Sequence, residues 1–382
     1  MENHNVNKFL PYGIQLKEVI EHPSITKPKL NSILKSRGIF LEETEDNVTF
    51  PIIQSTILSP FEFEDIRQTL KAKEDNRKLS TRMLEWHNTE DLIKVIPEKI
   101  DFKQLITEKF PRIKIDSSSN FAPIDGNPNK VGIKFTCISN NFNASWYRNK
   151  EKFDSEIIVE KIENNNQIAM KIFYTSPETF NVADLGVKHL EQVFKEKKYT
   201  KPNAVIERIL YRNFNNEERV AFFLNLTNDA DPFKFKGVKN IDLGPDKTLD
   251  LPAEINNFMS GGVKELKING ESLHENYFLK NKNNHKFVEL AGLEVVYDFS
   301  YHAAEGNCTV WFGFLGYLSK KNNQNIEFSI DVSEINFSSN HKNSNKEKVR
   351  MHLLQEFEKI KMMNYKLFSY SKLSEQYNPT EN

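Results

Sequence analysis

Asp246, Glu265 and Lys267 have the residue types and the spacing of a metal-dependent nuclease site. In nucleases of the PD-(D/E)xK class, an Asp at a strand end and a Glu-x-Lys on the next strand place two carboxylates at a Mg²⁺ ion and a lysine at the attacked phosphate. However, Asp246 lies within GPDKT, which is typical of a turn. Glu-x-Lys triplets are also frequent on the solvent faces of antiparallel strands. We therefore interpret the pattern as a polar strand surface and keep the nuclease as the alternative.

Other compact catalytic motifs are missing from the sequence. It contains no G-x-x-x-x-G-K-[ST] phosphate loop, no G-x-G-x-x-G fingerprint and no G-x-S-x-G nucleophile turn. The nine His residues show no HExxH spacing, which argues against a helical zinc site. Cys137 and Cys308 lie within strand-like runs, where a thiol is more often a small core residue than a nucleophile. The sequence thus predicts no catalytic residue, no metal site and no cofactor.

Four basic residues near the N-terminus form the candidate nucleic-acid-binding site. Lys27, Lys29, Lys35 and Arg37 lie within eleven residues that contain no acid, on a segment with an apolar stripe at helical spacing. Small helix-turn-helix-like and SAP-like folds present such residues to the phosphate backbone of nucleic acids. A solvated helix face explains the same pattern and is the competing interpretation.

A second candidate surface is the helix predicted over residues 345–367. Val349, Leu353, Phe357 and Ile360 recur at spacings of 4, 4 and 3, which places them on one side of a helix. Most of the basic residues of this segment fall on other sides. An apolar face of this kind packs on its own domain or on a partner subunit, and we name these four residues as candidate partner-binding residues.

Composition limits the classes of protein to which the chain can belong. Its 382 residues include 52 Lys and Arg against 53 Asp and Glu, for a formal net charge of −1, so any nucleic-acid site has to be a local patch. Two cysteines cannot build a disulfide framework. The N-terminus lacks the build of a signal peptide, and no apolar window approaches the ~18 residues of a membrane-spanning helix. We expect a cytoplasmic protein that does not bind membranes.

The distribution of predicted elements indicates an α+β fold with three parts. Residues 1–115 are predicted to form a small helical module, in which Ser59 caps a helix that starts at Pro60. Within it, residues 71–92 alternate in charge and are predicted to be an exposed helix or a hinge. Residues 116–340 are predicted to form a mostly antiparallel sheet domain with a few helices. Residues 341–382 are predicted to be a C-terminal docking helix and tail.

The sheet domain is predicted from hairpin-like runs of strand residues. Residues 111–132, rich in Ser, Pro, Asn and Gly, are predicted to be a connecting loop. One helix, FNVADLGVKHLEQVFKEKKY, interrupts the strands. The runs that predict strands are GIKFTCI, SEIIVEKI, QIAMKIFYT, RVAFFLNLT, ELKING, HKFVELAGLEVVYDFSY, NCTVWFGFLGYL and IEFSIDVSEINF.

Four long stretches of the sequence together resemble a known family. They are LPYGIQLKEVIEHPSITKPKLNSILKSRGIF, IIQSTILSPFEFEDI, NIDLGPDKTLDLPAEINNFMSGGVKELKINGESLHENYFL and LEVVYDFSYHAAEGNCTVWFGF. These stretches resemble the non-nuclease (b) subunit of the two-gene GAPS (Gabija-like) anti-phage defence systems of bacteria. The resemblance extends over most of the chain as a general similarity of sequence and includes no compact catalytic motif. It therefore assigns no catalytic residue to this sequence.

The resemblance implies a subunit of a hetero-oligomeric defence complex. Its partner would be a PD-(D/E)xK nuclease subunit encoded alongside it, and the catalytic residues would belong to that partner. We expect the chain itself to be non-catalytic and to contribute DNA binding or sensing. The alternative is a divergent Mg²⁺-dependent nuclease that uses Asp246, Glu265 and Lys267.

Overall fold

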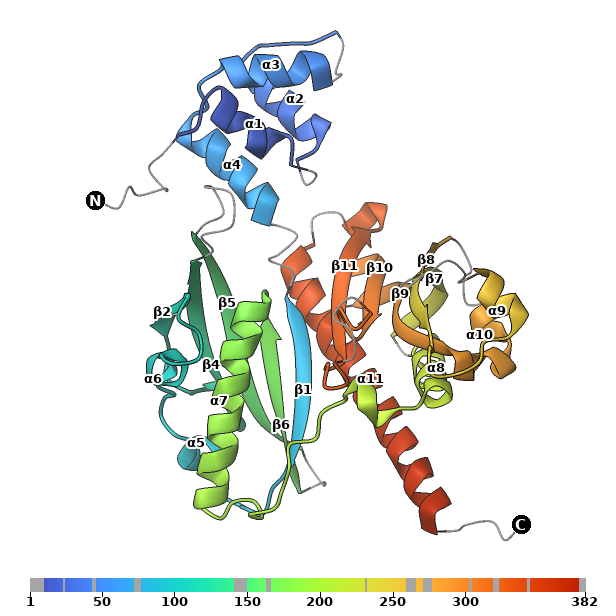
Figure 1. The fold of residues 1–382 in the computed structure, drawn as a ribbon. Helices are drawn as coiled ribbons and strands as arrows, with labels where there is room; N and C mark the ends of the chain where they lie inside the picture. Colours follow the sequence, from blue (N-terminus) through green and yellow to red (C-terminus); the bar gives the residue numbers. More distant parts are fainter. Residues whose placement is uncertain are drawn as a thin grey trace.

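The computed structural model confirms the predicted α+β fold. Helices at the N-terminus are followed by a large antiparallel sheet with several helices, and one long helix ends the chain (Figure 1). The structure describes residues 10–22, 25–42, 46–71, 77–140, 150–162, 166–230, 232–258, 266–270, 277–301, 304–318, 323–341 and 344–377.

The N-terminal helices form a bundle with a core of its own. They are α1 (Ile14–Ile20), α2 (Lys27–Ser36), α3 (Asp46–Ser55) and α4 (Pro60–Lys71). Leu30 of α2 and Ile66 of α4 are almost fully buried in that core. The predicted start of α4 at Pro60 is confirmed. Gly38 follows α2 with a φ of +77°, a conformation that glycine adopts without a steric penalty.

The sheet contains 11 strands among the described residues, and every neighbouring pair is antiparallel. Its order is β2-β4-β5-β6-β1-β11-β10-β9-β7-β8, with β3 paired to β4. The strands are β1 (Lys78–Glu85), β2 (Ile113–Ser118), β3 (Ala122–Ile124), β4 (Asn127–Asn140), β5 (Lys150–Ile162), β6 (Gln167–Tyr174), β7 (Phe233–Pro245), β8 (Leu266–Asn269), β9 (Val288–Tyr301), β10 (Ala304–Gly313) and β11 (Ser329–Phe337).

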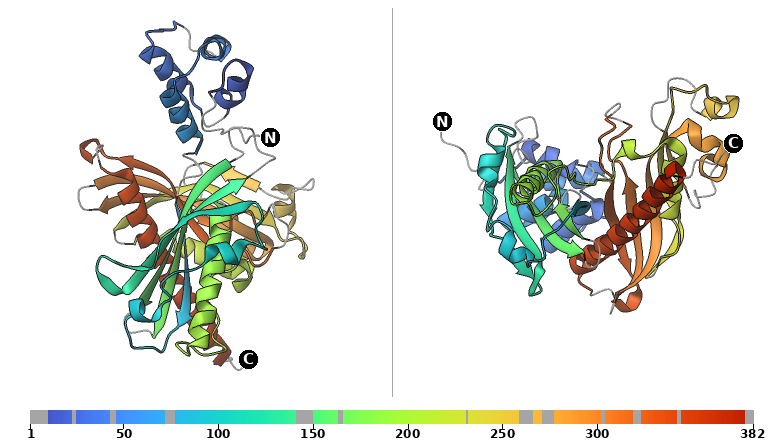
Figure 2. Two further views of the ribbon diagram at one scale, coloured as in Figure 1. Left: turned by 90° about the vertical axis from the view of Figure 1, so that its left-hand side faces the viewer. Right: turned by 90° about the horizontal axis from the view of Figure 1, so that it is seen from below.

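Two long helices, α7 (Pro177–Glu196) and α11 (Lys346–Tyr377), cover opposite faces of the sheet (Figure 2). Consecutive residues of a strand point to opposite faces. On β1, Arg82 donates a hydrogen bond to Asp184 of α7 at 2.6 Å, whereas the next residue, Met83, lines a hollow together with Met362 of α11. Each helix covers its own apolar core, one beneath α7 and one beneath α11.

Shorter helices fill the connections between strands. They are α5 (Leu92–Val95), α6 (Phe102–Ile106), α8 (Asn216–Asn225), α9 (Ala253–Phe258) and α10 (Tyr277–Lys280), with 3₁₀ turns η2 (Tyr211–Asn213), η4 (Lys282–Phe287) and η5 (Ser339–His341). The helix predicted in FNVADLGVKHLEQVFKEKKY is confirmed as α7.

The exposed helix or hinge predicted for residues 71–92 is wrong, because residues 78–85 form β1 in the middle of the sheet. Alternating charges suggest a solvated surface, but Arg82 is buried between Asp184, at 2.6 Å, and Glu327, at 2.9 Å. Burial alone would lower the pKa of Arg82, but the two carboxylates outweigh it and raise that pKa. The sheet therefore begins within the segment 1–115 that is predicted to be helical.

Two further segments differ from prediction. The run RVAFFLNLT, rich in strand-forming residues, belongs to α8, because Asn215 and Glu218 form a capping box that starts a helix there. The segment 111–132, predicted to be a loop, contains β2 and β3 and the start of β4. Its turn residues join short edge strands rather than forming a long connection.

Candidate functional site

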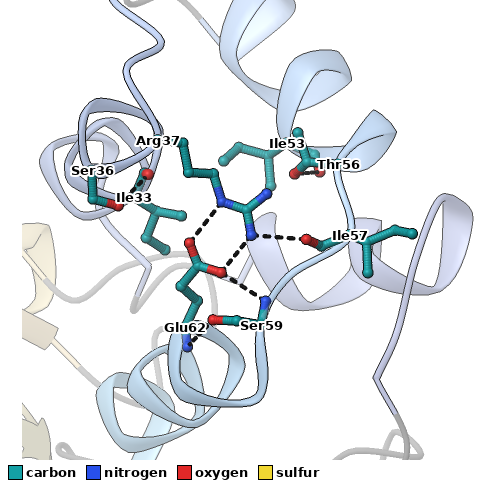
Figure 3. Close-up of polar contacts among 8 residues, drawn as sticks. All are labelled: Ile33, Ser36, Arg37, Ile53, Thr56, Ile57, Ser59 and Glu62. Atoms are coloured by element: carbon teal, nitrogen blue, oxygen red, sulfur yellow. Dashed lines mark hydrogen bonds and ion pairs between the residues drawn. The ribbon is translucent and has the colours of Figure 1, made fainter.

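Arg37 links three parts of the N-terminal bundle (Figure 3). Its Nε donates a hydrogen bond to Glu62 Oε1 at 2.7 Å, and its Nη2 donates to the other oxygen of Glu62 and to the Ile57 carbonyl at 2.8 Å. Ser59 and Glu62 also form the capping box of α4, in which the Ser59 N–H donates to Glu62 at 2.7 Å. We call Arg37, Ile57, Ser59 and Glu62 the Arg37 clamp.

The clamp strongly favours the ionised form of Glu62. The hydrogen bonds from Arg37 lower the pKa of Glu62 to about 2, with Ser59 acting in the same direction and partial burial opposing it. Glu62 in turn raises the pKa of Arg37 through the same hydrogen bonds. Bidentate pairs between Arg and carboxylate are among the stronger polar contacts in proteins, so this pair fixes the end of α2 against the start of α4.

The four predicted nucleic-acid-binding residues all lie on or beside α2, but their environments differ. Arg37 belongs to the clamp, and Lys29 pairs with Asp65 of α4 at 2.5 Å. The side chains of Lys27 and Lys35 are exposed. Contacts within the bundle involve Arg37 and Lys29, and a phosphate-contacting face made by the four residues stays a prediction.

Large apolar side chains are exposed on the N-terminal bundle. Tyr12, Ile14, Phe40, Ile57 and Phe61 are between 66% and 88% exposed. Phe40, Ile57 and Phe61 belong to the clamp or lie within three positions of a clamp residue in the sequence. Tyr12 and Ile14 flank Gly13, whose N–H donates a hydrogen bond to the Gln54 carbonyl at 3.1 Å. In Figure 3 the Ile57 side chain points away from Arg37 while its carbonyl faces the guanidinium. We call these five residues the N-terminal apolar surface; sequence analysis missed it, because exposure of an apolar residue has no local signature.

The predicted C-terminal helix is confirmed, and its apolar face packs on the chain's own sheet. Val349, Leu353 and Phe357 are almost fully buried, and Ile360 is partly buried against the same core. The Phe357 ring stacks on Phe233 of β7 with ring centroids 4.0 Å apart. Three of the four side chains are thus covered within the chain, and partner binding by these residues stays a prediction.

The residues of the nuclease alternative are only partly described. Asp246 directly follows β7 and accepts hydrogen bonds from Asn216 at 2.7 Å and from Thr248. Burial raises the pKa of Asp246, but these hydrogen bonds outweigh it and the net pKa is lowered. Lys267 of β8 pairs with Asp242, about 13 Å of strand away from Asp246. Glu265 lies outside the described residues, so the alternative stays a prediction.

Asp246 lies beside a buried arginine that sequence analysis did not predict. Arg219 of α8 is 2% exposed, and its guanidinium stacks on the Tyr211 ring at 3.5 Å. It donates hydrogen bonds to Asn216 Oδ1 at 2.9 Å and to a main-chain carbonyl at 3.0 Å. Nearby, Tyr317 donates to Glu289 at 3.0 Å. Arg219, Tyr211, Asn216, Asp246 and Glu289 line a polar hollow of 460 Å³, and the Nε of Arg219 has no hydrogen-bond partner among the described residues.

Both cysteines occupy the core, as predicted. Cys137 and Cys308 are fully buried, and burial raises the pKa of each thiol to about 12. Within the described ranges, no group of three or more His, Cys, Asp or Glu residues could hold a metal ion. The described helices include none with the length and apolar character needed to cross a membrane.

The N-terminal bundle matches a family model. Residues 15–76 match the model described as the GAPS4b protein N-terminal domain, a range that spans α1 to α4 and ends just before β1. The match supports the resemblance to the (b) subunit of a GAPS anti-phage system. No curated protein matches the chain.

Proposed function

We propose that this chain, which carries a GAPS4b-type N-terminal domain, is the non-catalytic (b) subunit of an anti-phage defence complex. Its partner is a PD-(D/E)xK nuclease subunit encoded alongside it, and the pair acts in the bacterial cytoplasm. The chain contributes the contact with the partner through the N-terminal apolar surface, and DNA binding or sensing through Lys27 and Lys35.

The N-terminal apolar surface is the observation that carries this proposal. Half of the large apolar residues that are prominently exposed on the described chain lie between residues 12 and 61, within the range of the bundle. The other five lie in connections between elements of the sheet domain and on α11, and they are Val205, Leu249, Leu315, Met363 and Leu367. Clustered exposed apolar residues mark protein–protein contacts, whereas single ones are ordinary.

The Arg37 clamp gives this surface a fixed shape. The Ile57 carbonyl accepts a hydrogen bond from Arg37, Phe61 directly precedes Glu62, and Phe40 follows Arg37 by three residues. The ion pair therefore holds the segments that carry these side chains. A surface that is already ordered loses little conformational entropy on binding, which favours affinity. The pair of Arg37 and Glu62 therefore supports partner binding by holding these segments in place, whereas the exposed Ile57 side chain belongs to the surface itself.

Partner binding can be tested by copurification with the nuclease subunit. We expect the triple variant Phe40→Ser/Ile57→Ser/Phe61→Ser to lose the partner, because truncating central apolar contacts costs about 1–2 kcal/mol or more each. The melting temperature of the isolated variant should stay close to that of the parent, since these side chains are exposed.

The matched control is Leu249→Ser/Leu315→Ser, which removes exposed apolar side chains outside the bundle. This control should retain the partner. If the triple variant copurifies with the nuclease subunit as well as the parent does, the N-terminal apolar surface is not the interface.

DNA binding can be tested on the assembled complex. Replacing Lys27 and Lys35 by Ala should reduce the salt dependence of duplex binding by roughly one unit of log–log slope for each phosphate that the chain no longer neutralises. Lys29→Ala serves as the control, because its ammonium already pairs with Asp65. An unchanged slope in the double variant would remove DNA contact by α2 from the proposal.

A further inference from the structure

Two neighbouring hollows lie on the sheet face that α11 covers. One has a volume of 330 Å³ and the other of 610 Å³, and both are lined by Met362 and Lys366 of α11. They are also joined through the backbone, because Met83 in the wall of the first exchanges hydrogen bonds with Glu207 in the wall of the second, at 2.8 and 3.2 Å. The two hollows can therefore hold two ends of one ligand.

The smaller hollow is apolar with two buried polar atoms, and we call it the apolar hollow. Its apolar walls come from Leu79, Met83, Ile162, Ala169 and Met362. Thr81 and Glu358 also line it; Thr81 is 4% exposed and Glu358 is 2% exposed. Neither Thr81 Oγ1 nor Glu358 Oε2 has a hydrogen-bond partner among the described residues.

Both atoms are buried in the wall itself, so a ligand reaches Glu358 Oε2 only when the neighbouring methionine side chains move aside. The other oxygen of Glu358 accepts a hydrogen bond from Lys361 at 2.5 Å, which keeps the carboxylate in place. A carboxylate only accepts hydrogen bonds, so a ligand group facing Oε2 has to donate one. A buried acceptor without a partner costs free energy, and a donor that reaches it recovers that cost. The methionine walls are flexible enough to admit a flat group.

The larger hollow is basic, and we call it the basic hollow. Arg208, Arg212 and Lys366 line it, and the one carboxylate in its wall is that of Glu207. No ion pair joins any of the three cations to a carboxylate among the described residues, although Lys171 and Lys359 in the wall of the apolar hollow pair with Glu160 and Glu356. Unpaired Arg and Lys side chains that converge on one hollow favour a phosphate group.

We propose that the two hollows bind a nucleoside phosphate. The base occupies the apolar hollow and donates an amino N–H to Glu358, while the phosphates lie among Arg208, Arg212 and Lys366. Adenine, guanine and cytosine carry an exocyclic amino group that can donate in this way. Uracil and thymine place carbonyl oxygens beside their single ring N–H, and these would face the carboxylate. The residues that line the two hollows lie outside the N-terminal bundle.

The proposal can be tested by calorimetry with the full chain and the monophosphates and triphosphates of adenosine, guanosine, cytidine and uridine. We expect at least one amino-bearing nucleotide to bind about tenfold or more tightly than the uridine nucleotide of equal charge. Arg208→Ala/Arg212→Ala should weaken binding by roughly tenfold or more and reduce its salt dependence. Arg112→Ala, which changes an exposed arginine outside both hollows, should have no effect.

Two further variants separate recognition of the base from loss of fold. Thr81→Val keeps the shape of the side chain and removes a hydroxyl that has no hydrogen-bond partner among the described residues. It should therefore leave the fold intact and weaken binding of a base that bonds to this hydroxyl. Glu358→Gln adds a donor and should shift preference towards uridine. Because it also removes the charge that pairs with the buried Lys361, its melting temperature is measured alongside. A short single-stranded oligonucleotide is tested in the same way. If it binds where mononucleotides do not, and if binding depends equally on Arg208 and Arg212, the ligand is a nucleotide within a nucleic-acid strand.

Three outcomes would overturn the proposal. They are no binding of mononucleotides or of the oligonucleotide, binding that Arg208→Ala/Arg212→Ala leaves unchanged, and equal binding of inorganic triphosphate, which has no base. Lys27→Ala/Lys35→Ala should leave nucleotide binding intact. Failure of this site is thus distinguishable from failure of DNA contact by α2.

Discussion

At the scale of single residues, local partners are predictable from the sequence and distant ones are not. The capping box of Ser59 and Glu62 follows from their spacing, because the two residues bond across one helical turn. The second role of Glu62, as the partner of Arg37, joins residues 25 positions apart. The same holds for Lys29 and Asp65. Four cations without neighbouring acids in sequence therefore predict a basic surface, although two of them pair within the bundle.

The clamp predicts a specific dependence of stability on pH. Because the pKa of Glu62 is lowered from 4.5 to about 2 in the folded state, its ionised form stabilises the bundle fully above about pH 4.5. That contribution is lost as the pH falls through about 2. Glu62→Gln should lower the free energy of unfolding by roughly 1–2 kcal/mol at neutral pH, which is less than for a buried pair because Glu62 is partly exposed. The stability of the variant should also fall less steeply than that of the parent as the pH decreases.

Thermal melts of the bundle between pH 2 and 7, followed by circular dichroism, would measure this difference. Glu64→Gln, which changes an exposed carboxylate on the same helix, is the control. If Glu62→Gln and the parent lose stability in parallel on acidification, Glu62 is not the group responsible.

At the scale of elements, the periodicity of apolar residues predicts where helices and strands form better than it predicts which other elements they pack against. The spacing of Val349, Leu353 and Phe357 predicts α11 and its apolar face. The spacing cannot say which surface that face meets. The same limit explains the failure at β1, whose neighbours β6 and β11 come from residues 167–174 and 329–337. Burial of Arg82 depends on those distant strands and on α7, so no window around residue 82 reveals it.

Phe357 provides the test at the scale of elements. Phe357→Ala should destabilise the isolated chain by about 3–5 kcal/mol, because the ring is buried and stacks on Phe233 at 4.0 Å. Met363→Ala, on an exposed part of the same helix, should change stability by less than about 0.5 kcal/mol. Urea unfolding of both variants without any partner measures the difference. If Phe357→Ala lowers copurification but leaves the unfolding curve unchanged, α11 docks on a partner instead.

At the scale of the whole molecule, the bundle and the sheet have separate cores. The core of α1–α4 shares no residue with the two cores of the sheet, and Figure 1 draws the bundle at one end of the molecule. The predicted division at residue 115 places β1 with the helices. The family match, by contrast, ends at residue 76, before β1. Composition could not locate this boundary, because the strands β1 and β2 are as polar in sequence as the helices that precede them.

Separate cores predict that the chain unfolds in two steps. Leu30→Ala should cost about 2–5 kcal/mol, which is comparable to the whole stability of about 3–5 kcal/mol expected for a domain of this size. The bundle should then be largely unfolded while the sheet keeps its own transition. Phe357→Ala should do the reverse, lowering the transition of the sheet and leaving that of the bundle in place. Calorimetry of both variants, with amide spectra of the fragment 1–76 as a reference for the folded bundle, measures each step. A single transition that both substitutions lower equally would show that the two cores unfold as one unit.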